Sequence, residues 1–345
     1  MQPATVNADA IDRSSRFAAA VRARVAEVVV GQDVVVERLL VALFTGGHLL
    51  LEGVPGLAKT LLVSVLAKSI DLDFRRVQFT VDLLPGDITG TEVLDPRSGE
   101  FRVVRGPVFT NLLLADEINR AAPKVQSALL EAMQERKVTI GGETMALPAP
   151  FLVIATQNPV EQSGTFELPE AQLDRFMLCH RLSYPTPAEE REVLRRNAAL
   201  GVRRLDRGAV ARSEFDVLDH ASVGTIDDLV AAMEALQDVH VSEAFTDHCV
   251  ELVARSRVHP ALDLGASPRA GIALVKAARA RALISGRRYV VPEDLLALVP
   301  DVLLHRIRLS YEALADGVTK EQVLADLLRT PGISTADGLT ASPER

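Results

Sequence analysis

A glycine-rich loop between an apolar run and a helical pattern constrains the fold of this chain more than any other feature. The loop follows the apolar residues 48–51 and consists of Gly53, Val54, Pro55, Gly56, Leu57, Ala58, Lys59 and Thr60. Glycine-rich backbone can point several N–H groups at one anion, and the positive N-terminal end of the next helix faces the same anion. This context predicts a phosphate-binding loop between a strand and a helix of an α/β domain.

Two side chains at the end of the loop carry the expected chemistry. Lys59 is placed to reach the β- and γ-phosphates of a nucleotide, and Thr60 is placed to hold Mg²⁺. The standard pattern has glycine before the lysine, whereas this chain has Ala58, whose methyl group is tolerated if the backbone keeps a negative φ. Taken alone, the segment has a competing interpretation as a chance glycine-rich turn.

An acidic pair ends the apolar residues 112–115. Because strand ends face the ligand crevice in parallel sheets, Asp116 could bind magnesium through water. Glu117 could polarise the water that attacks the γ-phosphate. An acidic pair after a strand is by itself usually a solvated turn, and the phosphate loop upstream reverses that interpretation.

Three further polar residues are candidates for the same chemistry. Asn158 ends another buried run and could orient the attacking water, although the segment alone reads as a turn. Arg175 precedes the last apolar run, and an arginine from a neighbouring protein can accelerate phosphoryl transfer about 10³–10⁵-fold. Arg269 falls in the first turn of a predicted helix, where it opposes the helix dipole, which hints at a compensating anion such as phosphate.

The order of predicted elements indicates two folded units. Five apolar runs, at residues 48–51, 76–79, 112–115, 151–155 and 177–182, alternate with helical patterns and predict a parallel sheet between helices. After residue 184 the strand signals stop. Helix-start signals then predict an all-helical remainder, and they lie at Thr186, Thr225, Ser267, Pro292 and Thr319.

The predicted boundaries follow from this change of pattern. We expect an N-terminal segment at 1–20, an α/β domain at 21–184, a linker helix at 185–213, a helical domain at 214–330 and a mobile tail at 331–345. Two interruptions of the α/β pattern look like insertions. Residues 81–107 are rich in Gly, Pro and Asp, and residues 137–148 resemble a hairpin that turns at Gly141 and Gly142.

Composition narrows the class of protein. Apolar residues make up 48% of the chain and aromatic residues only 4%, which is typical of helix-rich soluble proteins. The longest apolar-looking run, residues 39–51, is shorter than the roughly 20 residues of a membrane-spanning helix, and no secretion signal is evident, so the cytoplasm is expected. Cys179 and Cys249 lack metal-ligand spacing and are expected to be buried thiols.

The motifs together resemble those of the MoxR family of AAA+ ATPases. The resemblance rests on Ala58-Lys59-Thr60, residues 116–120, Asn158 and residues 168–176, and it covers nearly the whole chain. It implies an AAA+ P-loop core followed by a small helical lid, with ATP and Mg²⁺ as cofactors. The alanine before the lysine is similar to a variant found in this family.

The resemblance also implies roles for individual residues. Asp116 and Glu117 would be the Walker B pair, Asn158 sensor 1, Arg175 the arginine finger for an adjacent subunit, and Arg269 sensor 2. Arg120 would contact the neighbouring subunit. The segment of Val30, Gly31 and Gln32 would pack near adenine, and the two insertions would line or approach the pore of a ring.

Three functions remain open from the sequence. Members of this family are typically hexameric and chaperone-like, and they often work with von Willebrand factor A domain proteins, which implies ATP-driven remodelling or activation of a partner protein, including metal cofactor insertion. A nucleic-acid translocase is the first rival, although the formal net charge of −8 makes nucleic acid an unfavoured partner. The second rival is a nucleotide-gated binding module with little turnover.

Overall fold

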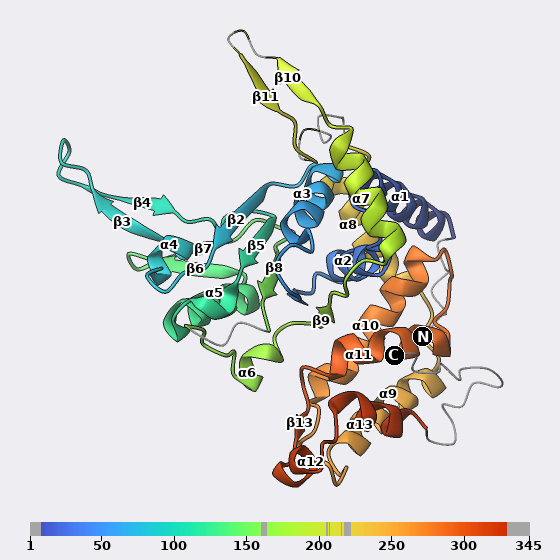
Figure 1. The fold of residues 1–345 in the computed structure, drawn as a ribbon. Coiled ribbons are helices and arrows are strands. Elements are labelled where there is room, and N and C mark those ends of the chain that lie inside the picture. The colour runs from blue at the N-terminus through green and yellow to red at the C-terminus, as the bar shows by residue number, and fades with distance from the viewer. Residues whose placement is uncertain are drawn as a thin grey trace.

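A five-stranded parallel sheet lies at the centre of the first half of the chain (Figure 1). The structure, a computed structural model, describes residues 8–159, 164–204, 206, 208–214, 216 and 222–329. The strands lie in the order β2-β5-β8-β1-β9 and span Leu49–Glu52 (β1), Phe74–Gln78 (β2), Leu112–Asp116 (β5), Leu152–Gln157 (β8) and Leu178–Arg181 (β9). The five predicted strands are confirmed, with no end displaced by more than two residues.

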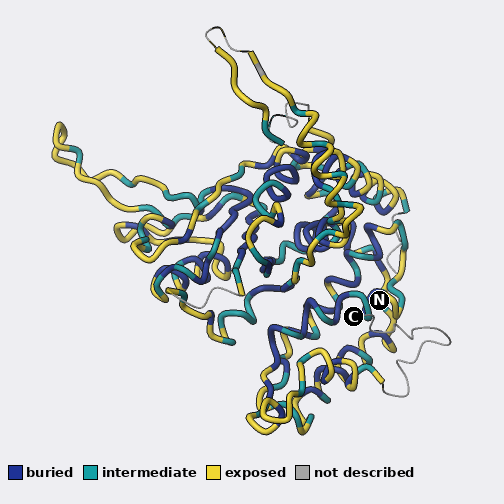
Figure 2. Tube along the Cα trace, viewed as in Figure 1, coloured by how far each residue is buried: buried dark blue, intermediate teal, exposed yellow. Residues whose placement is uncertain are grey.

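Helices cover both faces of this sheet. Helices α1 (Ala8–Ala26), α2 (Asp33–Thr45) and α3 (Lys59–Ser69) contribute to the core on one face, and α5 (Pro123–Glu135) contributes to the core on the other. Successive strand residues point to opposite faces, so Leu49 and Leu51 join the first core and Leu50 joins the second. Figure 2 shows a buried centre, to which β1, β5 and β8 contribute, and this burial on both faces explains why these three strands read as continuous apolar runs, whereas the edge strand β2 is largely exposed.

Both predicted insertions contain antiparallel hairpins. Helix α4 (Pro85–Thr89) leads into the hairpin of β3 (Gly90–Leu94) and β4 (Phe101–Arg105), which projects from the body and is largely exposed (Figures 1 and 2). Strands β6 (Lys137–Ile140) and β7 (Glu143–Ala146) pair around the predicted turn. Gly141 and Gly142 have φ of 58° and 85°, a combination that a tight hairpin turn favours.

Helices dominate the second half of the chain, and the five predicted helix starts are confirmed. Thr186, Thr225 and Thr319 each accept a hydrogen bond from the backbone N–H three residues later, which caps the helix. The helices from this point are α7 (Pro187–Ala198), α8 (Ile226–Ala235), α9 (Glu243–Ser256), α10 (Pro268–Ile284), α11 (Pro292–Leu303), α12 (Tyr311–Ala315) and α13 (Lys320–Leu328). Short helical turns occur at η1 (Ile118–Arg120), α6 (Glu170–Leu173) and η3 (Leu236–Asp238).

Two predictions about this organisation were wrong. The segment 185–213 is not one linker helix, because α7 ends at Ala198 and strands β10 (Val202–Arg204) and β11 (Ala209–Ala211) form a projecting hairpin (Figure 1). Gly201 has a φ of 65°, which L residues in a helix do not adopt, and the β-branched Val202 begins the strand. A second short pair, β12 (Leu262–Leu264) and β13 (Arg308–Leu309), also interrupts the predicted all-helical remainder.

The boundary at residue 21 also needs correction. Residues 8–26 form the single helix α1, in which Phe17, Val21 and Val25 recur at helical spacing and are buried. The first predicted division therefore falls inside a helix. The predicted mobile tail at 331–345 and the first seven residues lie outside the described part of the chain.

A buried network of ion pairs holds the later helices against the first unit. Arg38 on α2 pairs with Asp301 on α11 and donates to the carbonyl of Ala297 at 2.6 Å. Glu37, next to it, accepts from Arg281 on α10 at 3.1 Å. Removing one partner of a buried pair leaves the other charge uncompensated and costs about 3–5 kcal/mol. This network fixes α10 and α11 beside α2.

Candidate active site

The glycine-rich loop adopts two left-handed backbone conformations between β1 and α3. Gly56 has a φ of 89°, and Ala58 has a φ of 53° and caps the N-terminus of α3. The sequence leads us to expect that Ala58 is tolerated in place of glycine if its φ is negative, whereas the structure shows that its φ is positive. An L residue in this region costs roughly 1–2 kcal/mol, and the loop accepts that cost because αL geometry turns the chain into the helix. Helix α3 consequently presents its first N–H groups to the space enclosed by the loop.

Lys59 folds back over the mouth of the loop. Its Nζ donates hydrogen bonds to the carbonyls of Gly53 at 2.5 Å and Val54 at 3.3 Å. Partial burial lowers the pKa of the Lys59 ammonium, while the negative charges of Asp116 and Glu117 oppose that shift. An ammonium group has three donors, so one remains for a phosphate oxygen.

The carboxylate of Asp116 lies beside the loop, at the end of β5. Its Oδ2 accepts from the Thr60 hydroxyl at 3.3 Å and from the Arg76 guanidinium at 2.7 Å, and its Oδ1 accepts from the Thr156 hydroxyl at 2.6 Å. Mg²⁺ prefers hard oxygen ligands and usually binds one or two protein groups together with phosphate oxygens. The neighbouring hydroxyl of Thr60 and carboxylate of Asp116 fit that requirement.

Glu117 follows in a left-handed conformation with a φ of 56°, which turns its side chain away from the line of the strand. Its backbone N–H donates to the Thr156 hydroxyl at 2.9 Å. Its carboxylate accepts from Gln78 at 2.7 Å and pairs with Arg120 at 3.1 Å. Two neighbouring groups therefore orient the carboxylate that the sequence nominated as the base.

Three residues of this constellation were missed by sequence reasoning. Thr156 is fully buried and joins Asp116 to the backbone of Glu117, whereas Arg76 and Gln78 reach the acidic pair from β2. The hydroxyl at the polar end of an apolar run was a usable signal for Thr156. Arg76 and Gln78 carried none, because only the pairing of β2 with β5 places Gln78 opposite Asp116.

Two other predicted segments lie at the same edge of the sheet. Asn158 follows β8 immediately, and the N–H of Gly53 donates to the adjacent carbonyl of Gln157 at 3.2 Å. Val30, Gly31 and Gln32 join α1 to α2. Gly31 has a φ of 71°, a backbone conformation that favours glycine, and the carboxyl group of Glu189 in the first turn of α7 lies against it.

Arg175 and Arg269 lie at the opposite edge of the sheet. Both line a cavity of about 340 Å³ together with Gly46, Gly47 and His48, which precede β1, whereas the phosphate loop follows β1. The strands are parallel, so groups before β1 and groups after it lie at opposite ends of the sheet. The structure thus brings Arg175 and Arg269 together and separates both from the loop of the same chain.

The position of Arg269 in the first turn of α10 has a local counterpart. Its guanidinium lies 3.7 Å from the carboxylate of Asp174, which also accepts from Ser267 at 3.0 Å and from Arg306 at 2.8 Å. Asp174 supplies part of the negative charge that the sequence predicted near this helix end. Arg269 remains half exposed, with 53% of its side chain accessible, and can therefore reach a second anion.

A buried histidine forms part of the wall of the same cavity. The backbone N–H of Val153 donates to Nδ1 of His48 at 3.0 Å, so the proton resides on Nε2, which donates to the carbonyl of Met133 at 3.1 Å. Burial lowers the pKa of His48 to about 4, and the nearby Arg136 acts in the same direction. The imidazole is therefore a neutral clamp between β8 and α5.

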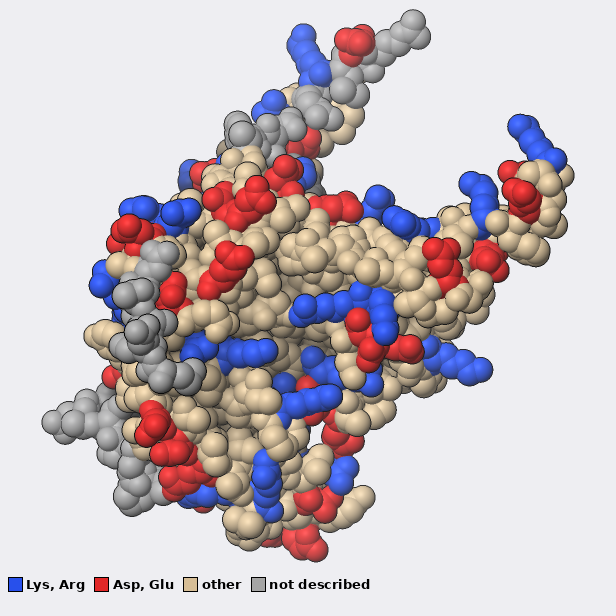
Figure 3. All heavy atoms as spheres, turned by 180° about the vertical axis from the view of Figure 1, so that it is seen from behind, with Lys and Arg blue, Asp and Glu red and all other residues tan. Residues whose placement is uncertain are grey.

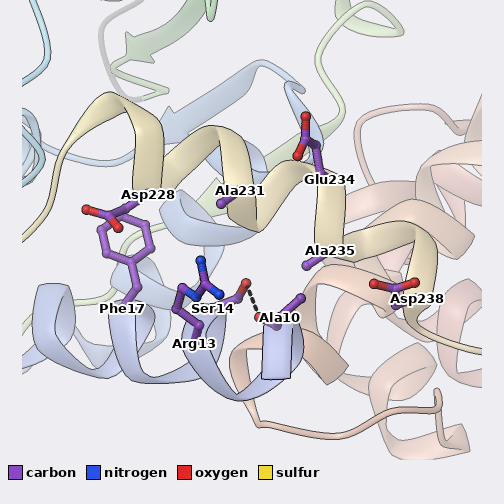
Figure 4. Close-up of a pocket in the computed structure, with 9 residues that line it drawn as sticks. All are labelled: Ala10, Arg13, Ser14, Phe17, Asp228, Ala231, Glu234, Ala235 and Asp238. Atoms are coloured by element: carbon purple, nitrogen blue, oxygen red, sulfur yellow. Dashed lines mark hydrogen bonds between the residues drawn. The ribbon is translucent and has the colours of Figure 1, made fainter. Parts of the chain in front are cut away.

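Another hollow, of about 320 Å³, lies between α1 and α8 (Figure 4). Two of its polar groups are engaged locally: the Ser14 hydroxyl donates to the carbonyl of Ala10 at 2.8 Å, and Asp228 accepts from Thr225 in the cap of α8. It contains none of the residues nominated for phosphate chemistry. The candidate active site is therefore the group of residues around Asp116.

Comparison with known proteins decides the family. Residues 48–178 match the ATPase family associated with various cellular activities (AAA), and residues 254–327 match the AAA lid domain. The chain is 46% identical over 309 residues to Chaperone MoxR1 of Mycobacterium tuberculosis, an alignment that covers 89% of this chain and 79% of that protein. This chain belongs to the MoxR family of AAA+ ATPases.

Other relatives agree with this assignment. Protein MoxR of Methylorubrum extorquens is 34% identical over 92% of this MoxR-family chain and 93% of its own length. A solved structure from Cytophaga hutchinsonii, described as that of a candidate ATPase, superposes with a TM-score of 0.83 at 44% identity and covers 93% of this chain and 96% of that one. The protein is an ATPase with an AAA core and an AAA lid. None of the described helices is long and apolar enough to cross a membrane.

Proposed function

We propose that this MoxR-family ATPase binds Mg·ATP at the loop of one subunit, hydrolyses it with help from a second subunit, and thereby remodels or activates a partner protein. The observation that carries the catalytic part is the arrangement around Asp116. Its carboxylate contacts the Thr60 hydroxyl of the loop, and the Thr156 hydroxyl links it to the backbone of Glu117. Phosphoryl transfer depends on positioning and charge more than on covalent chemistry, and this arrangement supplies both.

The residues at this edge take distinct roles. Lys59 and the N-terminus of α3 would hold the β- and γ-phosphates, and Thr60 with Asp116 would hold Mg²⁺, which supplies positive charge to the phosphate oxygens. Glu117 would accept a proton from the attacking water as general base, and Asn158 would orient that water. The proposal is supported by the chain positions of these residues, which follow the ends of β1, β5 and β8, three strands that are neighbours in the sheet.

The adenine end of the nucleotide is proposed at Val30, Gly31 and Gln32. This segment leads into α2, and the first turn of α7 lies against it at Glu189. The apolar side chain of Leu182 lies beside the loop, since a Cβ on Gly53 would lie 3.1 Å from the Cβ of Leu182. An apolar and backbone-rich surface beside the loop suits a purine ring.

Arg175 and Arg269 are proposed to act on the nucleotide of an adjacent subunit. They lie at the other end of the sheet from the loop of their own chain, and the four residues of β1 alone extend about 13 Å. A cation contributed by the neighbour would stabilise charge on the γ-phosphate during transfer. Sites shared in this way require a homo-oligomer. We propose a closed ring, a hexamer by resemblance to the family, in which each interface between neighbouring subunits forms one site.

The remodelling role rests on a relative and on exposed surface. The relative from M. tuberculosis is named as a chaperone, Chaperone MoxR1. The projecting β3–β4 hairpin exposes Leu94 and Phe101, with 49% and 69% of each residue accessible. Apolar side chains on a projecting element favour contact with another protein. A von Willebrand factor A domain protein is the proposed partner, and activation of its client, including metal insertion, the proposed outcome.

Nucleic-acid translocation is the less favoured alternative. Acidic and basic side chains are interspersed over the face shown in Figure 3, and the whole chain carries a formal charge of −8. Phosphate backbones are bound mainly by clustered Lys and Arg. Salt-sensitive stimulation of ATPase activity by DNA or RNA would favour the translocase, and absence of stimulation would favour a protein partner.

The experiment measures steady-state ATPase rate per subunit against protein concentration, with assembly followed by light scattering. We expect Glu117→Gln to bind ATP but to lose about 10²–10⁴-fold in rate, as expected for removal of a general base. Arg175→Ala should also lose activity and regain part of it when mixed with Lys59→Ala, which keeps its arginine. Arg191→Ala, an exposed arginine on α7, is the matched control. Negligible wild-type turnover at every concentration, despite tight ATP binding, would instead indicate a nucleotide-gated binding module.

A further inference from the structure

The cavity at the loop-distal edge of the sheet is unusually rich in positive charge. Its lining includes one carboxylate, Asp174, and five cationic side chains: Arg136, Arg175, Arg269, Lys276 and Arg306. The one histidine in the wall, His48, has a pKa lowered to about 4 by burial and adds no charge at neutral pH. Several like charges around one cavity repel one another, and a bound anion relieves that repulsion.

Arg306 is already committed to the fold. Its side chain is only 2% exposed, and it donates to Asp174 at 2.8 Å and to the carbonyl of Phe176 at 2.6 Å. It therefore balances Asp174. Arg136 has a separate structural explanation, because it follows α5 directly and a cation is favourable at a helix C-terminus.

Lys276 has no such explanation. It is exposed, and within the described part of the chain its ammonium makes no hydrogen bond or ion pair. It lies seven residues after Arg269 on α10, and Arg269, Ile272, Ala273 and Lys276 all line the cavity. This spacing places them on one face of the helix, where two turns extend about 10 Å. Arg269 and Lys276 thus lie two turns apart on the face of α10 that lines the cavity, and we call this pair of cations the cationic stripe.

The proposed function supplies an anion for this stripe. If Arg175 and Arg269 act across a subunit interface, the cavity faces the triphosphate bound by the loop of the adjacent copy. A compact ammonium on a flexible stem suits contact with phosphate oxygens, and its three donors need no fixed geometry. We propose that Lys276 is a further catalytic residue, contributed in trans, that contacts the polyphosphate held by the neighbouring subunit.

The test compares Lys276→Ala and Lys276→Arg with a control, Lys68→Ala, which changes an exposed lysine on α3. Loss of a charge-assisted hydrogen bond predicts a rate about 10- to 100-fold lower for Lys276→Ala, with ATP still bound by its own loop. Lys276→Arg keeps the charge and should retain most of the rate. Lys68→Ala should match the wild type, and thermal unfolding should be unchanged in all three variants.

Mixing separates a contact in trans from a structural effect. Lys276→Ala has an intact loop, and Lys59→Ala has an intact Lys276, so an interface between them contains one complete site. Recovery of ATPase activity in the mixture supports the proposal. A wild-type rate for Lys276→Ala, or a loss that Lys59→Ala subunits do not restore, overturns it.

The same experiment with Arg175→Ala distinguishes this inference from the function on which it rests. If Arg175→Ala is restored by Lys59→Ala while Lys276→Ala behaves as wild type, subunit sharing holds and only the role of Lys276 is wrong. If neither variant is restored, the proposal of shared sites is itself wrong.

Discussion

Replacing Thr156 with valine tests the arrangement around Asp116 most directly. The side chain is fully buried, and valine has nearly the same shape but no hydroxyl. In the wild type the hydroxyl donates to the Asp116 carboxylate at 2.6 Å and accepts from the N–H of Glu117 at 2.9 Å. The substitution removes both hydrogen bonds without opening a cavity.

The expected cost follows from these two contacts. A hydrogen bond to a charged group contributes about 1.5–3 kcal/mol, and a buried N–H left without an acceptor costs about 1–3 kcal/mol. Together they predict a loss of roughly 2.5–6 kcal/mol, divided between the free energy of unfolding and the positioning of the two carboxylates. If about 2 kcal/mol of this appears in the transition state, kcat falls about 30-fold.

The assay measures kcat, ATP affinity and the free energy of unfolding in urea for Thr156→Val, with Thr156→Ser as the matched control. Serine retains the hydroxyl and loses one methyl group, so its kcat should remain within about threefold of the wild type, at a cost of about 1 kcal/mol in stability. ATP affinity should change little in either variant, because the loop is untouched. The reasoning is refuted if valine matches the wild type in rate and stability, or if serine is as damaging as valine.

Three further predictions concern the pKa of a histidine, the loop and the ion-pair network. Burial lowers the pKa of His48 to about 4, so its contribution to stability is complete above the unfolded value of about 6.5 and is lost as pH falls from there through 4. This loss approaches about 3 kcal/mol, and urea unfolding as a function of pH should show a shallower acid dependence for His48→Gln than for the wild type. Ala58→Gly removes the strain of an L residue at a φ of 53°. Because glycine also has greater freedom in the unfolded chain, the net gain in the free energy of unfolding should be about 0.5–1 kcal/mol. A lower midpoint of urea unfolding than that of the wild type would contradict this. Asp301→Ala removes one of the two carboxylates that pair with the buried Arg38, while Glu37 keeps its own contact, and it also removes the partner of His180. This loss of hydrogen bonds to charged groups should cost about 1.5–3 kcal/mol, measured against the exposed control Asp316→Ala, with equal effects of the two substitutions as the contrary result.

Local sequence rules were sufficient for most of the secondary structure. The caps at Thr186, Thr225 and Thr319 depend on side chains three residues away, and the apolar strands depend on a run of neighbouring residues. Both are short-range effects that can be read along the chain. The same reasoning failed after Ala198, where a short exposed hairpin provides neither a long apolar run nor a buried face.

The candidate site was only partly predictable for a related reason. Asp116 and Glu117 belong to a motif contiguous in sequence, whereas Arg76 and Gln78 reach them only because β2 pairs with β5. Strand order is a long-range property, since the partner of a strand lies many residues away. No periodicity within β2 could have indicated that its polar side chains face the acidic pair.

The sequence by itself determined the phosphate loop, the acidic pair and the alternation of strands and helices, because each depends on residues close together in the chain. Tertiary structure alone decided the left-handed conformation of Ala58, the bridging role of Thr156 and the separation of Arg175 and Arg269 from the loop. These features depend on how strands are ordered and how α10 packs beside the sheet. Packing of the whole molecule decides which backbone conformation such a residue adopts and which distant segments come into contact. The local sequence pattern is only one of the contributions to the free energy of that packing.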